Sequence, residues 1–200
     1  MLNRFLMVAA AGFIVSVAAS QSACSRPASP PPAAEKPAAS AFTPVGTVKQ
    51  IMKGIIDPTS AAIWNAVSTE SGPKGVIEKA PSSDEDWAQL EHSALMLAEA
   101  TNLLKMPGRQ MALPEEANAK TAPDAPELTP KQIEEKVSKD LENWGKKADA
   151  LREAAVKAMA AAKAHDKDGI MNVGEAIDNA CEQCHVVYWY PDEKKATPKS

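Results

Sequence analysis

An apolar stripe at helical spacing, between residues 133 and 159, constrains the fold more than any other feature of the chain. Its members recur every three or four residues and are Ile133, Val137, Leu141, Trp144, Ala148, Leu151, Ala155 and Met159. Lys, Glu and Asp occupy most positions between them, which is typical of a helix with one buried face. Thr129, Pro130 and Gln132 form a capping signal just before the stripe. A helix is therefore predicted over residues 129–165.

Three other stretches carry the same spacing. The first covers residues 45–69, where Pro58 is expected to kink or interrupt the helix. The second covers residues 83–105 and opens with a serine cap and three acidic residues. The last begins at Asp166 or Asp168 and continues to residue 191. Residues 106–128 contain four prolines and no sustained period, so we expect a long loop there, with or without a short helix.

The composition favours helices over sheet. Only 4% of the residues are aromatic, glycine numbers 9, and alanine is abundant, a mixture that suits close-packed helices. Four amphipathic helices bury their apolar faces best against one another. The predicted fold class is all-α, an antiparallel four-helix bundle whose core has room for a cofactor between facing helices.

The N-terminal residues 1–23 are predicted to be a secretory signal peptide. Arg4 precedes an apolar stretch that ends in small residues. Small residues also stand directly before Cys24, as bacterial lipoprotein processing requires, so Cys24 is a candidate for lipidation. Gln21 occupies a position where lipoprotein signals usually carry an aliphatic residue, and ordinary cleavage is the alternative.

The rest of the chain divides into a tether and one domain. Residues 24–42 are rich in Pro, Ala and Ser and are expected to form an extended tether, and residues 43–195 form the predicted domain. No later stretch has the roughly 20 apolar residues that span a bilayer. We expect an exported periplasmic protein that meets the membrane only through a lipid anchor. The net charge of −4 argues against a nucleic-acid partner.

Residues 181–185 read Cys-Glu-Gln-Cys-His, the spacing of c-type haem attachment. On a helix, Cys181 and Cys184 project from one face, so both sulfurs can form thioethers to the two vinyl groups of one porphyrin edge. His185 then directs its imidazole toward the iron. The sequence predicts one covalent haem c, which export makes useful because covalent attachment prevents loss of the haem.

Three other interpretations use the same residues. A redox-active disulfide between Cys181 and Cys184 would be expected in a βαβ context, which this sequence lacks. A zinc site needs a fourth ligand from His92, His165 or a carboxylate. The third interpretation is two cysteines placed by chance on a buried helical face.

With this motif on its last helix, the chain resembles the class II c-type cytochromes, the cytochrome c prime group and its low-spin relatives. The resemblance covers about residues 45–191 and lies in stretches that match in order: Ile51-Met52, Pro58, residues 63–67, Trp87, residues 106–109 and residues 181–189. It implies that His185 is the proximal iron ligand and that Met52 occupies the slot of the distal ligand. A His/Met-ligated iron implies electron transfer with periplasmic redox proteins rather than catalysis. The family's homodimer stays open, because the tether, the long loop and Pro58 depart from the family pattern.

Several site residues have a second interpretation. Met52 is either the distal ligand or a core residue, and Met106, Met111, Met159 and Met171 are weaker candidates for the same role. If Met52 packs away from the iron, a five-coordinate haem that binds nitric oxide or carbon monoxide is the alternative function, and a haem-free helical bundle is a third.

The aromatic and arginine candidates are equally open. Trp64 and Trp144 line the haem or only pack the core. Arg109 pairs with a haem propionate or is merely solvated. Tyr188, Trp189 and Tyr190 shield the proximal side or pack the end of the helix.

Overall fold

A computed structural model describes residues 42–73 and 75–191 of the chain. The predicted signal peptide (1–23), the lipidation of Cys24, and the tether (24–42) except its last residue lie outside the described residues. The last four residues of the predicted domain (43–195) also lie outside them. The fold below concerns the described ranges alone.

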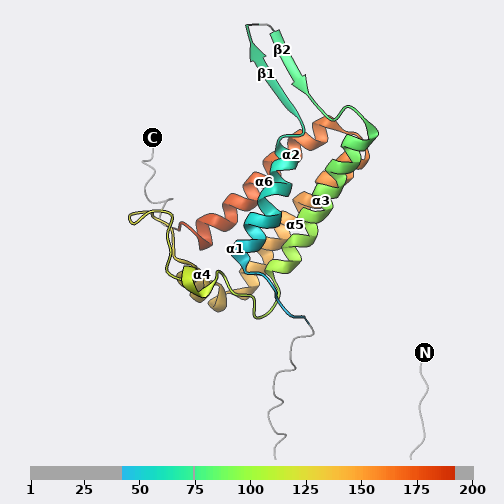
Figure 1. The fold of residues 1–200 in the computed structure, drawn as a ribbon. Coiled ribbons are helices and arrows are strands. Elements are labelled where there is room, and N and C mark those ends of the chain that lie inside the picture. Colours follow the sequence, from blue (N-terminus) through green and yellow to red (C-terminus); the bar gives the residue numbers. More distant parts are fainter. Residues whose placement is uncertain (1–41, 74, 192–200) are drawn as a thin grey trace, which may run out of the picture. The chain divides into compact units, whose positions relative to one another are not determined.

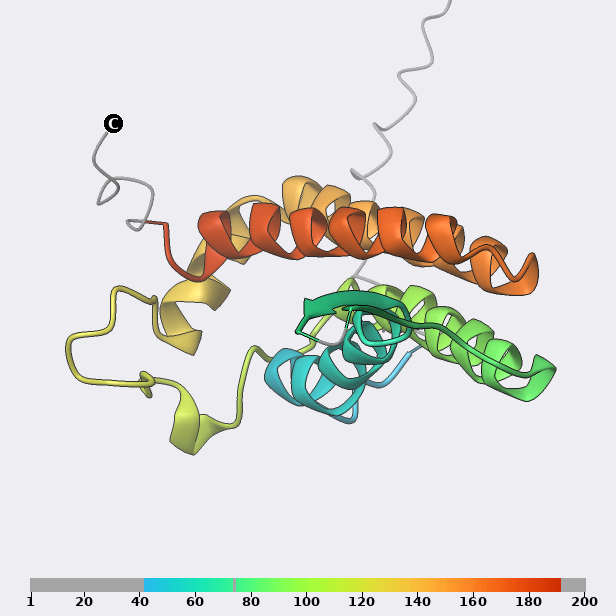
Figure 2. The same ribbon diagram turned by 90° about the horizontal axis from the view of Figure 1, so that it is seen from above.

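The described chain is mostly helical, with one small hairpin (Figure 1). In order, the elements are α1 (Val48–Ile51), η1 (Met52–Ile56), α2 (Asp57–Trp64), β1 (Ser68–Gly72), β2 (Gly75–Lys79), α3 (Asp84–Leu104), η2 (Pro114–Glu116), α4 (Pro130–Lys139), α5 (Leu141–Lys163) and α6 (Lys167–Tyr188). Helix α5 packs against both α3 and α6, and α2 contacts the same two helices. Figure 2 shows α6 alongside α5, and α2 beside α3. The prediction of a helical protein is confirmed, but the all-α class is too strict because of the hairpin.

Alanine and a few larger apolar residues form the interface between the long helices. Fully covered positions include Ala94 and Leu97 on α3, Ala155, Ala158 and Ala162 on α5, and Ile177 on α6. Small side chains let neighbouring helices approach closely, and burial of the interleaved apolar side chains drives the association. The low aromatic content of the chain is consistent with this core.

The predicted helix starts are confirmed at three positions. Ser83 and Asp86 form a capping box at α3, in which each side chain accepts a hydrogen bond from the other residue's backbone N–H. Thr129 and Gln132 do the same at α4. Asp166 caps α6 by accepting from the backbone N–H of Gly169 at 3.0 Å. Each cap satisfies donors that the first helical turn leaves unpaired.

The prediction of one continuous helix over residues 129–165 is wrong. The chain breaks at Asp140, whose backbone angles (φ −149°, ψ 58°) are not helical. The Asp140 carboxylate caps the new helix α5 by accepting from the backbone N–H of Asn143 at 3.2 Å. Leu141, which the apolar stripe placed in the core, is 66% exposed. A local aspartate cap therefore outweighs the continuity of the stripe.

The prediction that the first helix reaches residue 69 is also wrong. Helix α2 ends at Trp64, and strands β1 and β2 follow as an antiparallel pair in which Ser71 lies opposite Val76. Gly75 has a φ of 103°, a conformation that glycine adopts without a steric penalty, and it closes the turn. Helical periodicity beyond Trp64 rests on Val67 alone, so the strand-forming pair Val76 and Ile77 decides the local structure.

Pro58 interrupts the first helix as predicted, through a π-helical turn. Within η1 the hydrogen bonds widen, and the backbone N–H of Asp57 donates to the carbonyl of Met52, five residues earlier. Pro58 has no N–H to donate, and its ring would clash with the carbonyl four residues before it in a regular helix. The Thr59 hydroxyl donates to the Ile55 carbonyl at 2.6 Å, one turn earlier in the same segment.

The segment between α3 and α4 is a long loop with the short 3₁₀ turn η2 inside it, as expected. Backbone hydrogen bonds of 2.9 Å join its Gln110 and Met111 carbonyls to the N–H groups of Val48 and Lys49 at the start of α1. Lys49 also pairs with Glu116 at 2.6 Å. The loop is thus attached to the first helical segment.

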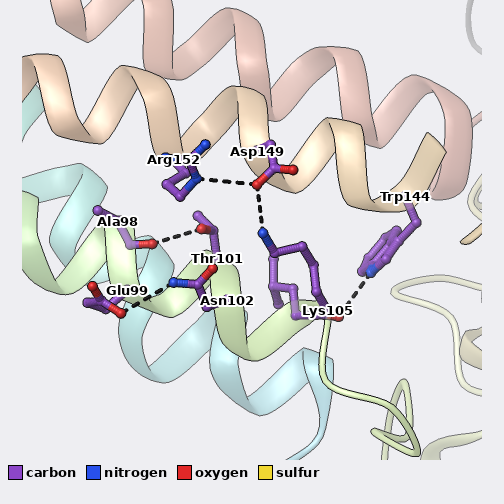
Figure 3. A network of polar contacts seen from close by, with 9 residues as sticks. Ala98, Glu99, Thr101, Asn102, Lys105, Trp144, Asp149 and Arg152 are labelled. Atoms are coloured by element: carbon purple, nitrogen blue, oxygen red, sulfur yellow. Dashed lines mark hydrogen bonds and ion pairs between the residues drawn. The ribbon is translucent and has the colours of Figure 1, made fainter. Parts of the chain in front are cut away.

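Polar contacts join α3 to α5 near the same end of the molecule (Figure 3). Lys105 and Arg152 both reach the carboxylate of Asp149, at 2.6 and 3.3 Å. The hydrogen bond from Lys105 holds the pKa of Asp149 below its ordinary value. The indole N–H of buried Trp144 donates to the Leu104 carbonyl at 2.9 Å, which satisfies one of the last carbonyls of α3.

A pair of leucine variants tests this assignment of the core. Leu97→Ala removes a side chain with no exposed surface, whereas Leu95→Ala removes one that is 46% exposed on the same helix. We expect Leu97→Ala to lower the free energy of unfolding by about 2–5 kcal/mol and Leu95→Ala to change it by less than about 0.5 kcal/mol. Urea denaturation followed by circular dichroism measures both, and equal effects would contradict the burial described above.

Candidate functional site

The Cys-Glu-Gln-Cys-His motif lies in the last two turns of α6. Cys181, Cys184 and His185 are each half-buried, and all three line one cavity. Both cysteines are free thiols. The helix therefore presents two thiols and an imidazole to the same space, as the spacing of the motif predicts.

Two cavities adjoin at this place. The smaller has a volume of about 90 Å³ and the larger about 440 Å³. They share five lining residues, namely Met52, Asp57, Trp144, Cys184 and His185. The larger cavity falls within the range of about 300–1,000 Å³ that small-molecule and cofactor sites occupy. It extends from the first helical segment to the loop before α4.

Met52 is brought to the motif from a distant part of the chain. It begins the π-helical turn η1, is partly buried, and lines both cavities. Met111 lines only the larger cavity, and Met106, Met159 and Met171 line neither. The structure therefore favours Met52 over the other methionines as a residue facing the motif.

Both tryptophans named from the sequence line the smaller cavity. Trp144 is buried and meets the ring of Tyr188 edge-on at 5.2 Å between ring centroids. Trp64 is 41% exposed, and its indole N–H donates to the Gly174 carbonyl at 3.0 Å. Trp64 therefore links α2 to α6 as well as lining the cavity.

Arg109 lies elsewhere. Its guanidinium donates to the carbonyls of Leu103 and Gly46 and to the sulfur of Met106. It lines neither cavity, so the structure gives it the role of holding the loop to the start of the first helical segment. The pairing of Arg109 with a haem propionate stays a prediction.

Four lysines line the two cavities. Lys49, Lys53 and Lys120 line the larger cavity, and Lys147 lines the smaller one. Sequence reasoning missed these residues because a lysine on the polar face of a helix or in a loop carries no distinguishing pattern. They supply positive charge to a lining that is mostly apolar but also includes the carboxylates of Asp57 and Glu127.

Burial sets the protonation of the three motif side chains. It raises the pKa of the Cys181 thiol to about 11, with smaller contributions from Asp178 and Asp57. It likewise raises the pKa of the Cys184 thiol to about 12. For His185 burial lowers the pKa of the imidazole, against the opposing effect of nearby carboxylates. Near neutral pH the thiols are therefore protonated and the imidazole is neutral, the form that binds metals.

One buried hydroxyl at the cavity lacks a partner. Among the buried side-chain oxygen and nitrogen atoms of the described residues, only Oγ of Ser60 has no hydrogen bond. Ser60 is 1% exposed and lines the smaller cavity. An unpaired buried hydroxyl costs about 1–3 kcal/mol, so this wall of the cavity offers a polar atom to whatever fills it.

The zinc interpretation requires at least three His, Cys, Asp or Glu side chains that converge on one point. Within residues 42–73 and 75–191 no such group is present. No helix in this part of the chain is both long enough and apolar enough to cross a membrane.

Comparison with known proteins adds no identification. No family model, no curated protein and no solved structure matches the chain significantly.

The protonation of the thiols can be tested in the haem-free chain. Only the thiolate is alkylated, so iodoacetamide at about pH 8 should label folded Cys181 and Cys184 on the order of 100-fold and 1,000-fold more slowly than the same residues in urea. The rates follow from mass spectrometry of time points, with Cys24→Ser removing the third thiol. Equal rates in folded and unfolded chain would contradict the burial of these thiols.

Proposed function

We propose that this protein is a monohaem c-type cytochrome that transfers electrons, with haem attached to Cys181 and Cys184 and with His185 as an iron ligand. The observation that carries the proposal is that the motif on α6 and Met52 on η1 line the same cavities. In this proposal, the α1–α2 segment, α3, α5 and α6 act as an antiparallel four-helix bundle around the haem.

The residues present suit such a group. Each thiol would add across one vinyl group, so that a carbon–sulfur bond forms, the double bond becomes single, and the thiol proton moves to the neighbouring carbon. Neutral His185 would supply a nitrogen lone pair to the iron. The mostly apolar walls suit a porphyrin face, and the lysines among the lining residues suit its two carboxylates. Bound haem would supply one-electron redox chemistry.

Met52 decides which kind of haem protein this is. A thioether ligand from Met52 would fill the sixth position, leave no place for a gas, and raise the reduction potential. Electron transfer then requires little rearrangement. We further propose that the carrier is exported, is anchored by lipid at Cys24 through the tether, and exchanges electrons with periplasmic redox proteins.

A second function has one observation in its favour. The unpartnered hydroxyl of Ser60 lies on the same helical segment as Met52 and lines the smaller cavity. A hydroxyl donor near an open iron position would stabilise a bound nitric oxide or carbon monoxide. This alternative requires a five-coordinate iron and a Met52 side chain that only fills space.

Covalent haem is the first test. We expect the protein purified after export to carry one haem that stays with the chain on denaturation, measured as a pyridine haemochrome. The double variant Cys181→Ala/Cys184→Ala should lose covalent haem, because both thioethers are gone. Cys24→Ser is the matched control and should retain the haem. Wild-type protein without covalent haem would overturn the proposal.

Substitution of Met52 is the second test. Met52→Ala should convert low-spin iron to high-spin iron and abolish the far-red absorption band of methionine-ligated ferric haem. Met111→Ala changes a methionine that lines the same larger cavity and should leave the spectrum unchanged. If Met52→Ala leaves the spectrum unchanged and the reduced protein binds carbon monoxide, the gas-binding alternative replaces electron transfer.

A further inference from the structure

Glu127 is a carboxylate buried in a loop. It is 8% exposed, and of the buried residues in the described part of the chain it is the only one that carries a charge. Taking a carboxylate out of water is costly unless hydrogen bonds replace the lost hydration. One carboxylate oxygen accepts from the backbone N–H of Thr121, and the other accepts from the indole N–H of Trp189 at 3.0 Å. These two hydrogen bonds replace part of the hydration that the buried carboxylate loses.

Trp189 is held to the loop at a second point. Its carbonyl accepts a hydrogen bond from the backbone N–H of Leu128 at 2.6 Å. Trp189 directly follows α6, and its own N–H donates to the His185 carbonyl at 2.7 Å. The loop before α4 and the end of the motif helix are therefore joined through one residue, although they are about sixty positions apart in the sequence.

The ring of Trp189 contacts the imidazole of His185. The two rings meet edge-on, with centroids 5.0 Å apart and planes at 84°. An imidazole at a helix end can rotate about its bond to Cβ, and a neighbouring ring at this distance limits that rotation. Trp189 is itself 38% exposed, so packing alone does not hold it. The Tyr190 ring contacts both Trp189 and His185, with centroids 5.4 and 5.8 Å away. The hydrogen bond to Glu127 adds a directional restraint on the Trp189 indole.

All of these residues border the larger cavity. Thr121, Glu127, Leu128, His185 and Trp189 line it together. The hydrogen bond from the Thr121 backbone holds the pKa of Glu127 below its ordinary value, so the acceptor for the indole N–H is ionised near neutral pH. A charged acceptor makes a stronger hydrogen bond than a neutral one.

We propose that Glu127 is a positioning residue for His185, acting through Trp189 to set the plane of the imidazole at the edge of the cavity. The importance of this role for the iron rests on the proposed function, whereas the link between the three side chains does not. The alternative is that Glu127 only anchors its loop.

Three variants separate these roles. Glu127→Ala removes the acceptor, Trp189→Phe removes the donor but keeps a ring, and Glu127→Gln keeps an oxygen that can accept the same N–H. Glu116→Gln is the control. Glu116 lies in the same loop as Glu127, pairs with Lys49 of α1, and lines neither cavity. Pyridine haemochrome measurements on the full chain first establish whether haem is bound, which tests the proposed function by itself.

The readout in the haem-bound protein is the set of paramagnetically shifted haem methyl proton resonances, which depend on the orientation of the imidazole plane. We expect Glu127→Ala and Trp189→Phe to shift these resonances in the same direction, the double variant to add little to either, and Glu127→Gln to have a smaller effect. Glu116→Gln should leave the resonances in place. Non-additivity is expected because both single variants remove one hydrogen bond.

A second readout needs no haem. In the haem-free full chain, the ring of Trp189 should shift the His185 imidazole proton resonances, and Glu127→Ala should move these resonances toward their values in the unfolded chain. The proposal is overturned if folded Glu127→Ala and Trp189→Phe leave the His185 resonances, and the haem methyls where haem is bound, at wild-type positions. A loss of stability without such a shift would assign Glu127 to loop anchoring alone.

Discussion

Close contact between alanine-bearing helices is the constraint on which the rest of the structure depends. Helix α5 packs on both α3 and α6, and its Ala155, Ala158 and Ala162 are covered completely. Side chains of this size leave little freedom in the separation of the helices. The positions of α3 and α6 relative to each other are therefore set by α5. The same packing sets the place of the cavities that Trp144 and Cys184 both line.

The cavities occur where that alanine interface gives way to larger and more varied side chains. Trp144, Leu104 and Leu151 line the smaller cavity on the side of α3 and α5, and Met52 approaches from the interrupted first helix. The π-helical turn at Met52 follows from Pro58, which prevents a regular helix at this point. Pro58 thus affects the position of Met52, which lies earlier in the same helical segment.

The sequence predicted the helices where a cap and a stripe agreed, as at Ser83, Thr129 and Asp166. It failed where a short-range choice overruled the stripe, as at Asp140 and in the hairpin after Trp64. For the site, local spacing was enough to group Cys181, Cys184 and His185, and the resemblance placed Met52 beside them. The contacts of Arg109 and the burial of Glu127 were not predicted, because no local pattern specifies the loop carbonyls or the indole that these side chains contact.

The hydrogen bonds around the site differ greatly in the number of residues that separate donor from acceptor in the sequence. The bond from Trp144 to Leu104 joins residues 40 apart, whereas the bond from Trp64 to Gly174 joins residues 110 apart. Loop closure costs more entropy as the closed segment lengthens, so contacts between neighbouring helices form more readily than those that bring α2 onto α6. The contact of α2 with α6 therefore has the larger closure cost, and the wall of the cavity that these two elements form together depends on it.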